Sequence, residues 1–104
     1  MLRHIVLIRF APEADQAAID RYAAEATRLA AAIGGVRSYV AAPDAARTIA
    51  GVEGNADFAV VADFDDYAAF QAYTSHEAHK RLASDLLAPV LGSRTAIQIE
   101  IPGR

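Results

Sequence analysis

Two strand-like segments of this 104-residue chain are apolar at successive positions, so both of their faces seek burial. The first covers residues 5–8 (IVLI), and the second lies within residues 58–64 (FAVVADF). Successive side chains of a strand point to opposite faces of its sheet. Antiparallel sheets commonly leave one face to water, but a sheet built on these strands must be covered on both sides. This requirement restricts the folds that are open to the chain.

Helical periodicity follows the first of these strands. Apolar residues recur at helical spacing over residues 19–33, which predicts an amphipathic helix. Asp15 is placed to cap this helix, and the glycine pair at 34–35 is placed to end it. A weaker strand is predicted over residues 36–42, and a long loop over residues 43–55 separates it from the third strand.

The last third of the chain predicts a broken helix and a final strand. The helical stretch lies between residues 67 and 88, where Asp65 or Asp66 can cap its first part and Ser75 its second part. Residues 96–101 alternate between apolar and polar types and predict a strand. The side chains expected to face inward from this strand are Ile97, Ile99 and Ile101.

The predicted order is β-α-β-β-α-β, which is the ferredoxin-like unit of the α+β class. We expect one domain over residues 1–104, with a four-stranded antiparallel sheet and both helices on one face. The other face would then expose apolar side chains, and a patch of that kind marks an interface. A second copy packed face to face around a two-fold axis covers it most simply, which predicts a homodimeric α+β barrel joined through its sheets. The residues expected on that face are Ile5, Leu7, Ala59 and Val61.

Composition excludes several classes of function. The net charge is −3 and no basic stripe is present, which argues against a nucleic-acid partner. The chain has no cysteine, so disulfides, zinc–thiolate sites and thiol catalysis are excluded. The first residues lack a signal-peptide layout, and no apolar run approaches the ~20 residues of a membrane span. We therefore expect a cytoplasmic protein with no membrane partner.

Residues 70–79 (FQAYTSHEAH) hold a tyrosine and two of the three histidines of the chain. Histidine exchanges protons near neutrality, and a tyrosine beside it can donate a hydrogen bond to a developing oxyanion. His79 is thus a candidate base and Tyr73 a candidate donor, unless both are structural residues near a helix end. His76 and His79 are three residues apart, whereas the zincin motif has its histidines four apart. We therefore expect no metal.

A pocket between the helices and the sheet would bring these groups together. His4 shares a strand face with Val6 and Ile8, so it can reach the pocket from the first strand. We expect His4, Tyr73 and His79 to be the catalytic residues. The ligand pocket is expected to be lined by Val6, Ile8, Tyr22, Val60 and His76.

Three separated segments carry a family resemblance, namely residues 3–10 (RHIVLIRF), 57–64 (DFAVVADF) and 72–79 (AYTSHEAH). The chain resembles the stress-responsive A/B barrel (Dabb) family of dimeric α+β barrel proteins. The resemblance implies the fold deduced above. It also implies links to stress-induced oligomers and to a plant polyketide cyclase that performs an aldol condensation without a cofactor. The tyrosine and histidine of that cyclase match Tyr73 and His79, and its strand histidine matches His4.

The chain departs from the family pattern in ways that bear on function. Glu77 stands where the family motif His-Pro-x-His has proline, and several expected pocket positions carry small or aliphatic residues. The resemblance therefore implies a small cofactor-independent enzyme, or a binder of a small hydrophobic or polyketide-like molecule. Two alternatives stay open, a non-catalytic stress-linked oligomer and a cofactor-free monooxygenase-like protein. The small or aliphatic positions are Ala23, Ala26, Leu82 and Val90.

Overall fold

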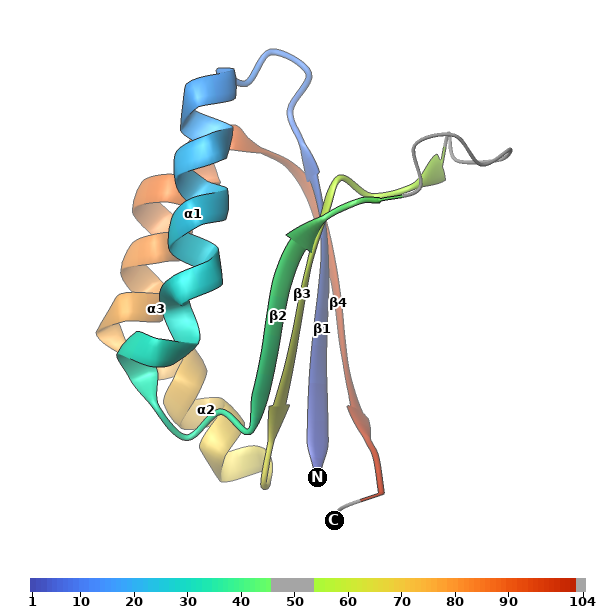
Figure 1. The fold of residues 1–104 in the computed structure, drawn as a ribbon, viewed down its shortest axis with the longest axis vertical. Helices are drawn as coiled ribbons and strands as arrows, with labels where there is room; N and C mark the ends of the chain where they lie inside the picture. Colours follow the sequence, from blue (N-terminus) through green and yellow to red (C-terminus); the bar gives the residue numbers. More distant parts are fainter. Residues whose placement is uncertain (46–53, 103–104) are drawn as a thin grey trace.

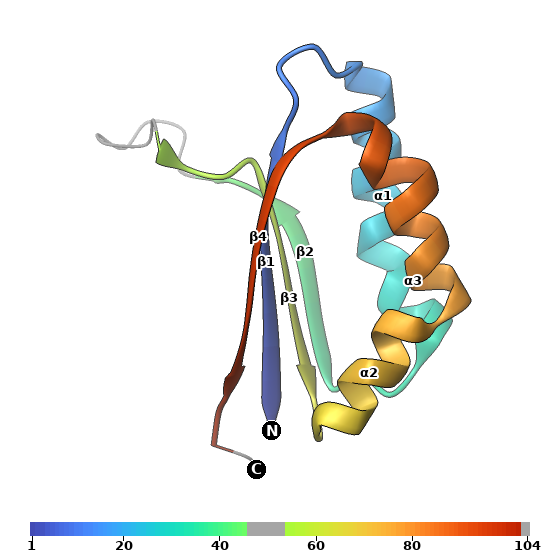
Figure 2. The same ribbon diagram turned by 180° about the vertical axis from the view of Figure 1, so that it is seen from behind.

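Four strands form one antiparallel sheet, and the helices pack on one of its faces (Figures 1 and 2). The computed structural model describes residues 1–45 and 54–102. The strands lie in the order β2-β3-β1-β4, so the predicted ferredoxin-like α+β fold is confirmed. The strands are β1 (Leu2–Phe10), β2 (Ser38–Pro43), β3 (Phe58–Phe64) and β4 (Leu91–Glu100). The helical elements are α1 (Gln16–Ile33), α2 (Tyr67–Ser75), α3 (Glu77–Arg81), the π-helical segment η2 (Leu82–Leu87) and the 3₁₀ turn η3 (Ala88–Val90).

Local boundaries differ from the predicted ones where the signals are weak. β2 begins at Ser38 instead of residue 36, because the two preceding glycines at the end of α1 both have positive φ. Asp15 occupies the N-cap position of α1, but its side chain makes no capping hydrogen bond. Most of the predicted loop over residues 43–55 lies outside the described residues, since 46–53 are not among them.

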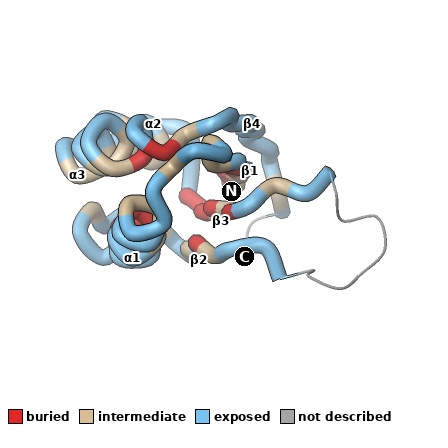
Figure 3. The backbone as a smooth tube through the Cα atoms, turned by 90° about the horizontal axis from the view of Figure 1, so that it is seen from above, coloured by how far each residue is buried: buried red, intermediate tan, exposed pale blue. Residues whose placement is uncertain are grey.

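The core lies between the sheet and the helices, where the buried positions face each other (Figure 3). β1 sends alternate side chains into this layer, and β3 pairs with it so that Val6 lies opposite Val60 and Ile8 opposite Phe58. From α1, Tyr22 and Ala26 are buried against them. Ala26 has no exposed surface, and its small side chain brings the helix close to the sheet.

The final strand corrects one prediction. β4 begins at Leu91, and Ile97 and Ile99 face away from the helices, because they pair across β1 with Ile5 and Arg3. Gln98 takes the helix side instead, where it meets His4. The alternation correctly groups the isoleucines on one face, but it does not say which face. The expectation that the apolar face would be the helix-covered face is wrong here, because the open face is apolar too.

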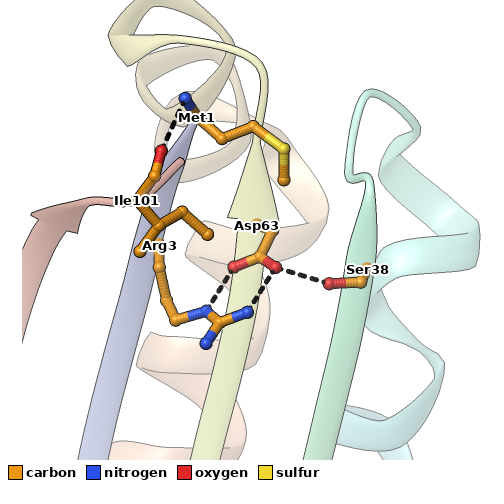
Figure 4. A network of polar contacts seen from close by, with 5 residues as sticks. All are labelled: Met1, Arg3, Ser38, Asp63 and Ile101. Atoms are coloured by element: carbon orange, nitrogen blue, oxygen red, sulfur yellow. Dashed lines mark hydrogen bonds and ion pairs between the residues drawn. The ribbon is translucent and has the colours of Figure 1, made fainter. Parts of the chain in front are cut away.

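The open face is bounded at one end by an ionic row (Figure 4). Arg3 donates two hydrogen bonds to the carboxylate of Asp63, at 2.7 and 2.9 Å, and Ser38 donates a third at 2.9 Å. The Arg3 guanidinium thereby holds the pKa of the Asp63 carboxyl below its ordinary value. Beyond this row the face is apolar, and Leu7 (44% exposed) and Ile97 (55% exposed) lie bare to water.

No helix in the described part of the chain is both long and apolar enough to cross a bilayer.

The close packing at Ala26 makes a testable prediction. Ala26→Leu adds volume where α1 meets the sheet, so the free energy of unfolding should fall by about 1–3 kcal/mol. Ala24→Leu on the exposed side of the same helix is the matched control and should change stability by less than about 0.5 kcal/mol. Urea unfolding followed by circular dichroism measures both. Equal effects of the two substitutions would show that the helix is not packed as described.

Candidate active site

A break between α2 and α3 places the two candidate catalytic side chains on the same side. Tyr73 and His79 are six residues apart, and in one continuous helix of 3.6 residues per turn they would point about 120° apart. α2 ends at Ser75, His76 adopts an extended conformation (φ −65°, ψ 141°), and α3 begins at Glu77. The rings of Tyr73 and His79 consequently meet edge to face, with 4.8 Å between their centroids.

His76 itself makes this break. Its ring nitrogen Nδ1 accepts a hydrogen bond from the backbone N–H of Ala78 at 3.0 Å, so it caps α3. The prediction that Ser75 caps this helix is therefore wrong by one residue. Of the two residues predicted to cap α2, Asp65 and Asp66, it is Asp66 that accepts a hydrogen bond from the N–H of Ala69, at 2.9 Å. His76 is exposed and does not line the cavity described below, so the structure separates it from the other two histidines.

His4 reaches the site from the middle of the sheet. It is 3% exposed, and its Nδ1 lies 2.6 Å from the side-chain oxygen of Gln98 on the neighbouring strand β4. With the amide in this orientation, Nδ1 carries the ring proton and donates a hydrogen bond to the oxygen of Gln98. The His4 ring also contacts two aromatic rings, Phe70 and Tyr73, at centroid distances of 4.9 and 6.2 Å. The second ring nitrogen of His4 therefore keeps its lone pair.

One cavity of about 70 Å³ connects these side chains between the sheet, α1 and η2. Every residue expected at the site except His76 lines it. The cavity thus unites groups from β1, α1, β3, α2 and α3, which are far apart in the sequence. The lining side chains are His4, Val6, Ile8, Tyr22, Leu29, Tyr39, Val60, Tyr73, His79, Leu82, Ala83, Leu87 and Arg94.

Two polar residues of the lining were not predicted from the sequence, Tyr39 and Arg94. The Tyr39 hydroxyl donates to the backbone oxygen of Ala26 at 2.6 Å and lies beside Tyr73, so it connects the neighbourhood of the donor to α1. Arg94 comes from the first half of β4, which the sequence left unassigned. Arg94 and Gln98 are both even-numbered and so lie on the same face of the strand. A predicted strand that began at residue 91 would therefore have placed Arg94 on the helix side.

Burial keeps the imidazoles and phenols of the cavity neutral. Desolvation lowers the pKa of both His4 and His79 below the ordinary 6.5, and the nearby Arg94 cation lowers both further. Desolvation also raises the pKa of Tyr22 and of Tyr73 to about 12. At neutral pH the cavity therefore holds two unprotonated imidazoles beside protonated phenols, an arrangement that supplies a base and a hydrogen-bond donor together.

Two larger depressions on the surface lack such groups. A groove of about 450 Å³ runs between α1 and the α3–η2 segment, and a hollow of about 520 Å³ lies on the open face of the sheet. Neither is lined by a histidine or a tyrosine, so volume alone does not locate the chemistry. In the described ranges, no three histidine, aspartate or glutamate side chains gather in a way that could hold a metal ion.

The comparison with protein families now places the chain. Residues 2–101 match the family described as the stress responsive A/B barrel domain, Dabb. The chain belongs to this family. No curated protein matches the chain. Because the match covers nearly the whole chain, the resemblance that was based on three short segments is confirmed.

Solved structures agree with the Dabb fold. A dimeric ferredoxin-like protein of unknown function from Thermobifida fusca YX is 32% identical, with 96% of this chain and 90% of that chain covered and a TM-score of 0.81. A Dabb family protein from Mesorhizobium loti is 22% identical, with 98% and 97% covered and a TM-score of 0.76. A hydroxynitrile lyase from Passiflora edulis is 16% identical, with 99% and 94% covered and a TM-score of 0.82. The last two similarities concern the fold alone.

The buried histidines make a prediction about pH. The ring protons of His4 and His79 should titrate below pH 6.5, because burial opposes their protonation. Since both take up protons more readily in the unfolded chain, the protein should lose stability as the pH falls below about 6.5. Proton NMR of the imidazole signals, assigned with His4→Gln and His79→Gln, measures the midpoints. A midpoint at or above 6.5 for either residue would contradict the burial described here.

Proposed function

We propose that this Dabb protein is a small enzyme that moves a proton on a carbonyl compound without a cofactor. The observation that carries the proposal is the contact between the His79 imidazole and the Tyr73 phenol in one partly open cavity. Their lowered and raised pKa values leave one ready to accept a proton and the other ready to donate a hydrogen bond. These are the two functions that enolisation requires.

The proposed reaction begins when a ketone enters with its carbonyl oxygen toward Tyr73. A ring nitrogen of His79 takes a proton from the carbon next to the carbonyl, and the electron pair of that C–H bond forms an enolate. The Tyr73 hydroxyl donates a hydrogen bond to the enolate oxygen, where negative charge develops. The enolate carbon then takes the proton back, or attacks a second carbonyl in an aldol step whose alkoxide is protonated by the imidazolium.

His4 acts in this scheme as a positioning residue. Its bond to Gln98 fixes the ring, and the ring edge contacts Tyr73 and Phe70. Tyr39 lies against Tyr73 on the other side and is anchored to α1 by the hydrogen bond that it donates to Ala26. The donor is therefore held by side chains on two strands, which limits the reorganisation that the reaction would otherwise need.

Proton transfer can be tested on small ketones. In D₂O, the wild-type protein should accelerate hydrogen–deuterium exchange at the carbon next to the carbonyl of butanone, followed by proton NMR. His79→Gln should lower this rate by about 10²–10⁴-fold, because it removes the base. Tyr73→Phe should lower it by about 10²–10³-fold, because it removes an oxyanion donor.

A matched control is available in the same segment. Tyr67→Phe removes an exposed hydroxyl from α2, so it should keep the wild-type rate. Circular dichroism confirms that each variant folds. If folded His79→Gln and Tyr73→Phe variants exchange at the wild-type rate, the two side chains are structural and the protein is a non-catalytic oligomer of the stress-linked type.

We further propose that the protein is a homodimer joined through the open face of its sheet. Leu7, Val40 and Ile97 are 44, 60 and 55% exposed there, and no helix covers them. The Thermobifida fusca relative is described as dimeric, which supports a dimer here too. Two such faces packed around a two-fold axis would bury the apolar rows and form the barrel.

The dimer is tested by one charge on the open face. Leu7→Asp would bury a carboxylate at the centre of the interface without a partner, so the protein should become monomeric. Tyr67→Asp, at an exposed apolar position on the helix layer, is the control and should stay dimeric. Light scattering after gel filtration measures the mass. A dimeric Leu7→Asp variant would exclude this sheet-to-sheet assembly.

A further inference from the structure

We propose that the cavity takes a small oxo acid, whose carboxylate binds the Arg94 guanidinium while its carbonyl meets Tyr73 and His79. This inference rests on the proposed function and names the substrate class of that site. Its starting point is the composition of the lining. Among the described residues, no aspartate or glutamate lines the cavity, and Arg94 is the one charged side chain of the lining. The imidazoles and phenols there are neutral at pH 7.

Arg94 reaches the cavity from the regularly paired part of β4, at an even-numbered position that shares its face with Gln98. β1 and β4 pair regularly from Leu2 to Arg9, and the register then shifts so that Phe10 lies opposite Leu91. Gly92 is the extra residue, and a Cβ there would lie 3.0 Å from the backbone oxygen of Arg9. A bulge of this kind lets two residues at odd spacing share a face. Leu91 can therefore pack on the core while Arg94 also faces the helices.

The guanidinium of Arg94 is unpaired within residues 1–45 and 54–102. All ion pairs within these ranges are made by other cations. Within the same ranges, Arg94 has no carboxylate partner and no side-chain hydrogen bond. The residue is exposed on the edge strand β4, so it forms the rim of the cavity. A planar donor without a partner at the mouth of a neutral pocket is suited to a carboxylate, which it can bind in a bidentate manner. The paired cations are Arg3, Arg28, Arg37 and Lys80.

The charge of Arg94 reaches the reacting groups. It lowers the pKa of both His4 and His79, and it also lowers that of Tyr22. A bound carboxylate would offset this effect, because its negative charge favours the protonated imidazole. Burial is the main reason that His79 is unprotonated in the free protein, and Arg94 adds to this effect, so the substrate anion would strengthen the base as it binds.

The volume of the cavity limits the size of the acid. A water molecule needs about 10–15 Å³ of such space, and the cavity offers about 70 Å³. It therefore has room for roughly five heavy atoms beyond the rim. A short 3-oxo acid such as acetoacetate matches this, since its carboxylate can stay at Arg94 while its ketone enters. The proton that His79 removes then comes from the carbon between the two groups, and the enolate forms on the ketone oxygen at Tyr73.

Binding of two isosteric probes tests the charge selection. Propionate and propionamide differ in charge but have nearly the same shape, and two-dimensional NMR titration measures the affinity of each. The wild-type protein should bind propionate at least about tenfold more tightly, as expected for a hydrogen bond to a charged group. Arg94→Gln should abolish this preference and leave propionamide binding unchanged. Arg21→Gln, which removes an exposed arginine of α1, is the matched control and should retain the preference.

The same titration reports the coupling to His79. Saturating propionate should raise the pKa of His79 in the wild-type protein and should leave it unchanged in Arg94→Gln. Equal affinity for both probes in the wild-type protein, a loss of both in folded Arg94→Gln, or no propionate binding at all would each overturn the inference.

Failure of this inference is distinguishable from failure of the proposed function. If only the inference fails, Arg94→Gln will exchange protons on acetoacetate and on butanone as fast as the wild-type protein. If only the proton-transfer function fails, His79→Gln will leave every exchange rate unchanged while propionate still binds through Arg94. If both hold, Arg94→Gln should slow exchange on acetoacetate more than exchange on neutral butanone.

Discussion

Burial of both faces of the central strands is the constraint on which the rest of the structure depends. β1 lies between β3 and β4, and its alternate side chains divide into a helix-covered set and an open set. Because the covered set includes His4 among aliphatic residues, covering this face also desolvates an imidazole. Because the open set is apolar as well, the same strand leaves a surface that needs a partner. The candidate cavity and the proposed interface thus lie on the two faces of one strand.

The sequence was sufficient to predict the structure wherever a single periodicity of apolar residues dominates a segment. The element order, the extent of α1 and the helix-side residues of β1 and β3 follow from apolar spacing, so Val6, Ile8 and Val60 could be assigned to the pocket in advance. It was not sufficient for β4. There the alternation of isoleucines is compatible with either face, and only pairing with β1 decides that Gln98, and not Ile97 or Ile99, approaches the helices.

The site was predictable in its aromatic and imidazole groups but not in its supports. Tyr73 and His79 lie close in the chain, so a local break is enough to align them. Tyr39 is contributed by a strand with weak patterning, and its role depends on how closely α1 approaches β2, which Ala26 permits. Arg94 lies in the first half of β4, where no alternation of apolar and polar residues announces a strand. Features that arise from contacts between distant elements are therefore the ones that the sequence left out.

The pairing of β4 with β1 also determines when the site can exist. His4 lies in the first strand, and its hydrogen-bond partner Gln98 lies 94 positions later in the last one. During synthesis, β1 emerges from the ribosome long before β4, and its free edge is open to pairing with other chains. Contacts between such distant positions form slowly, because a long loop must close first. The cavity should therefore be among the last features to form, and the nascent protein should depend on quick helix docking to protect β1 until then.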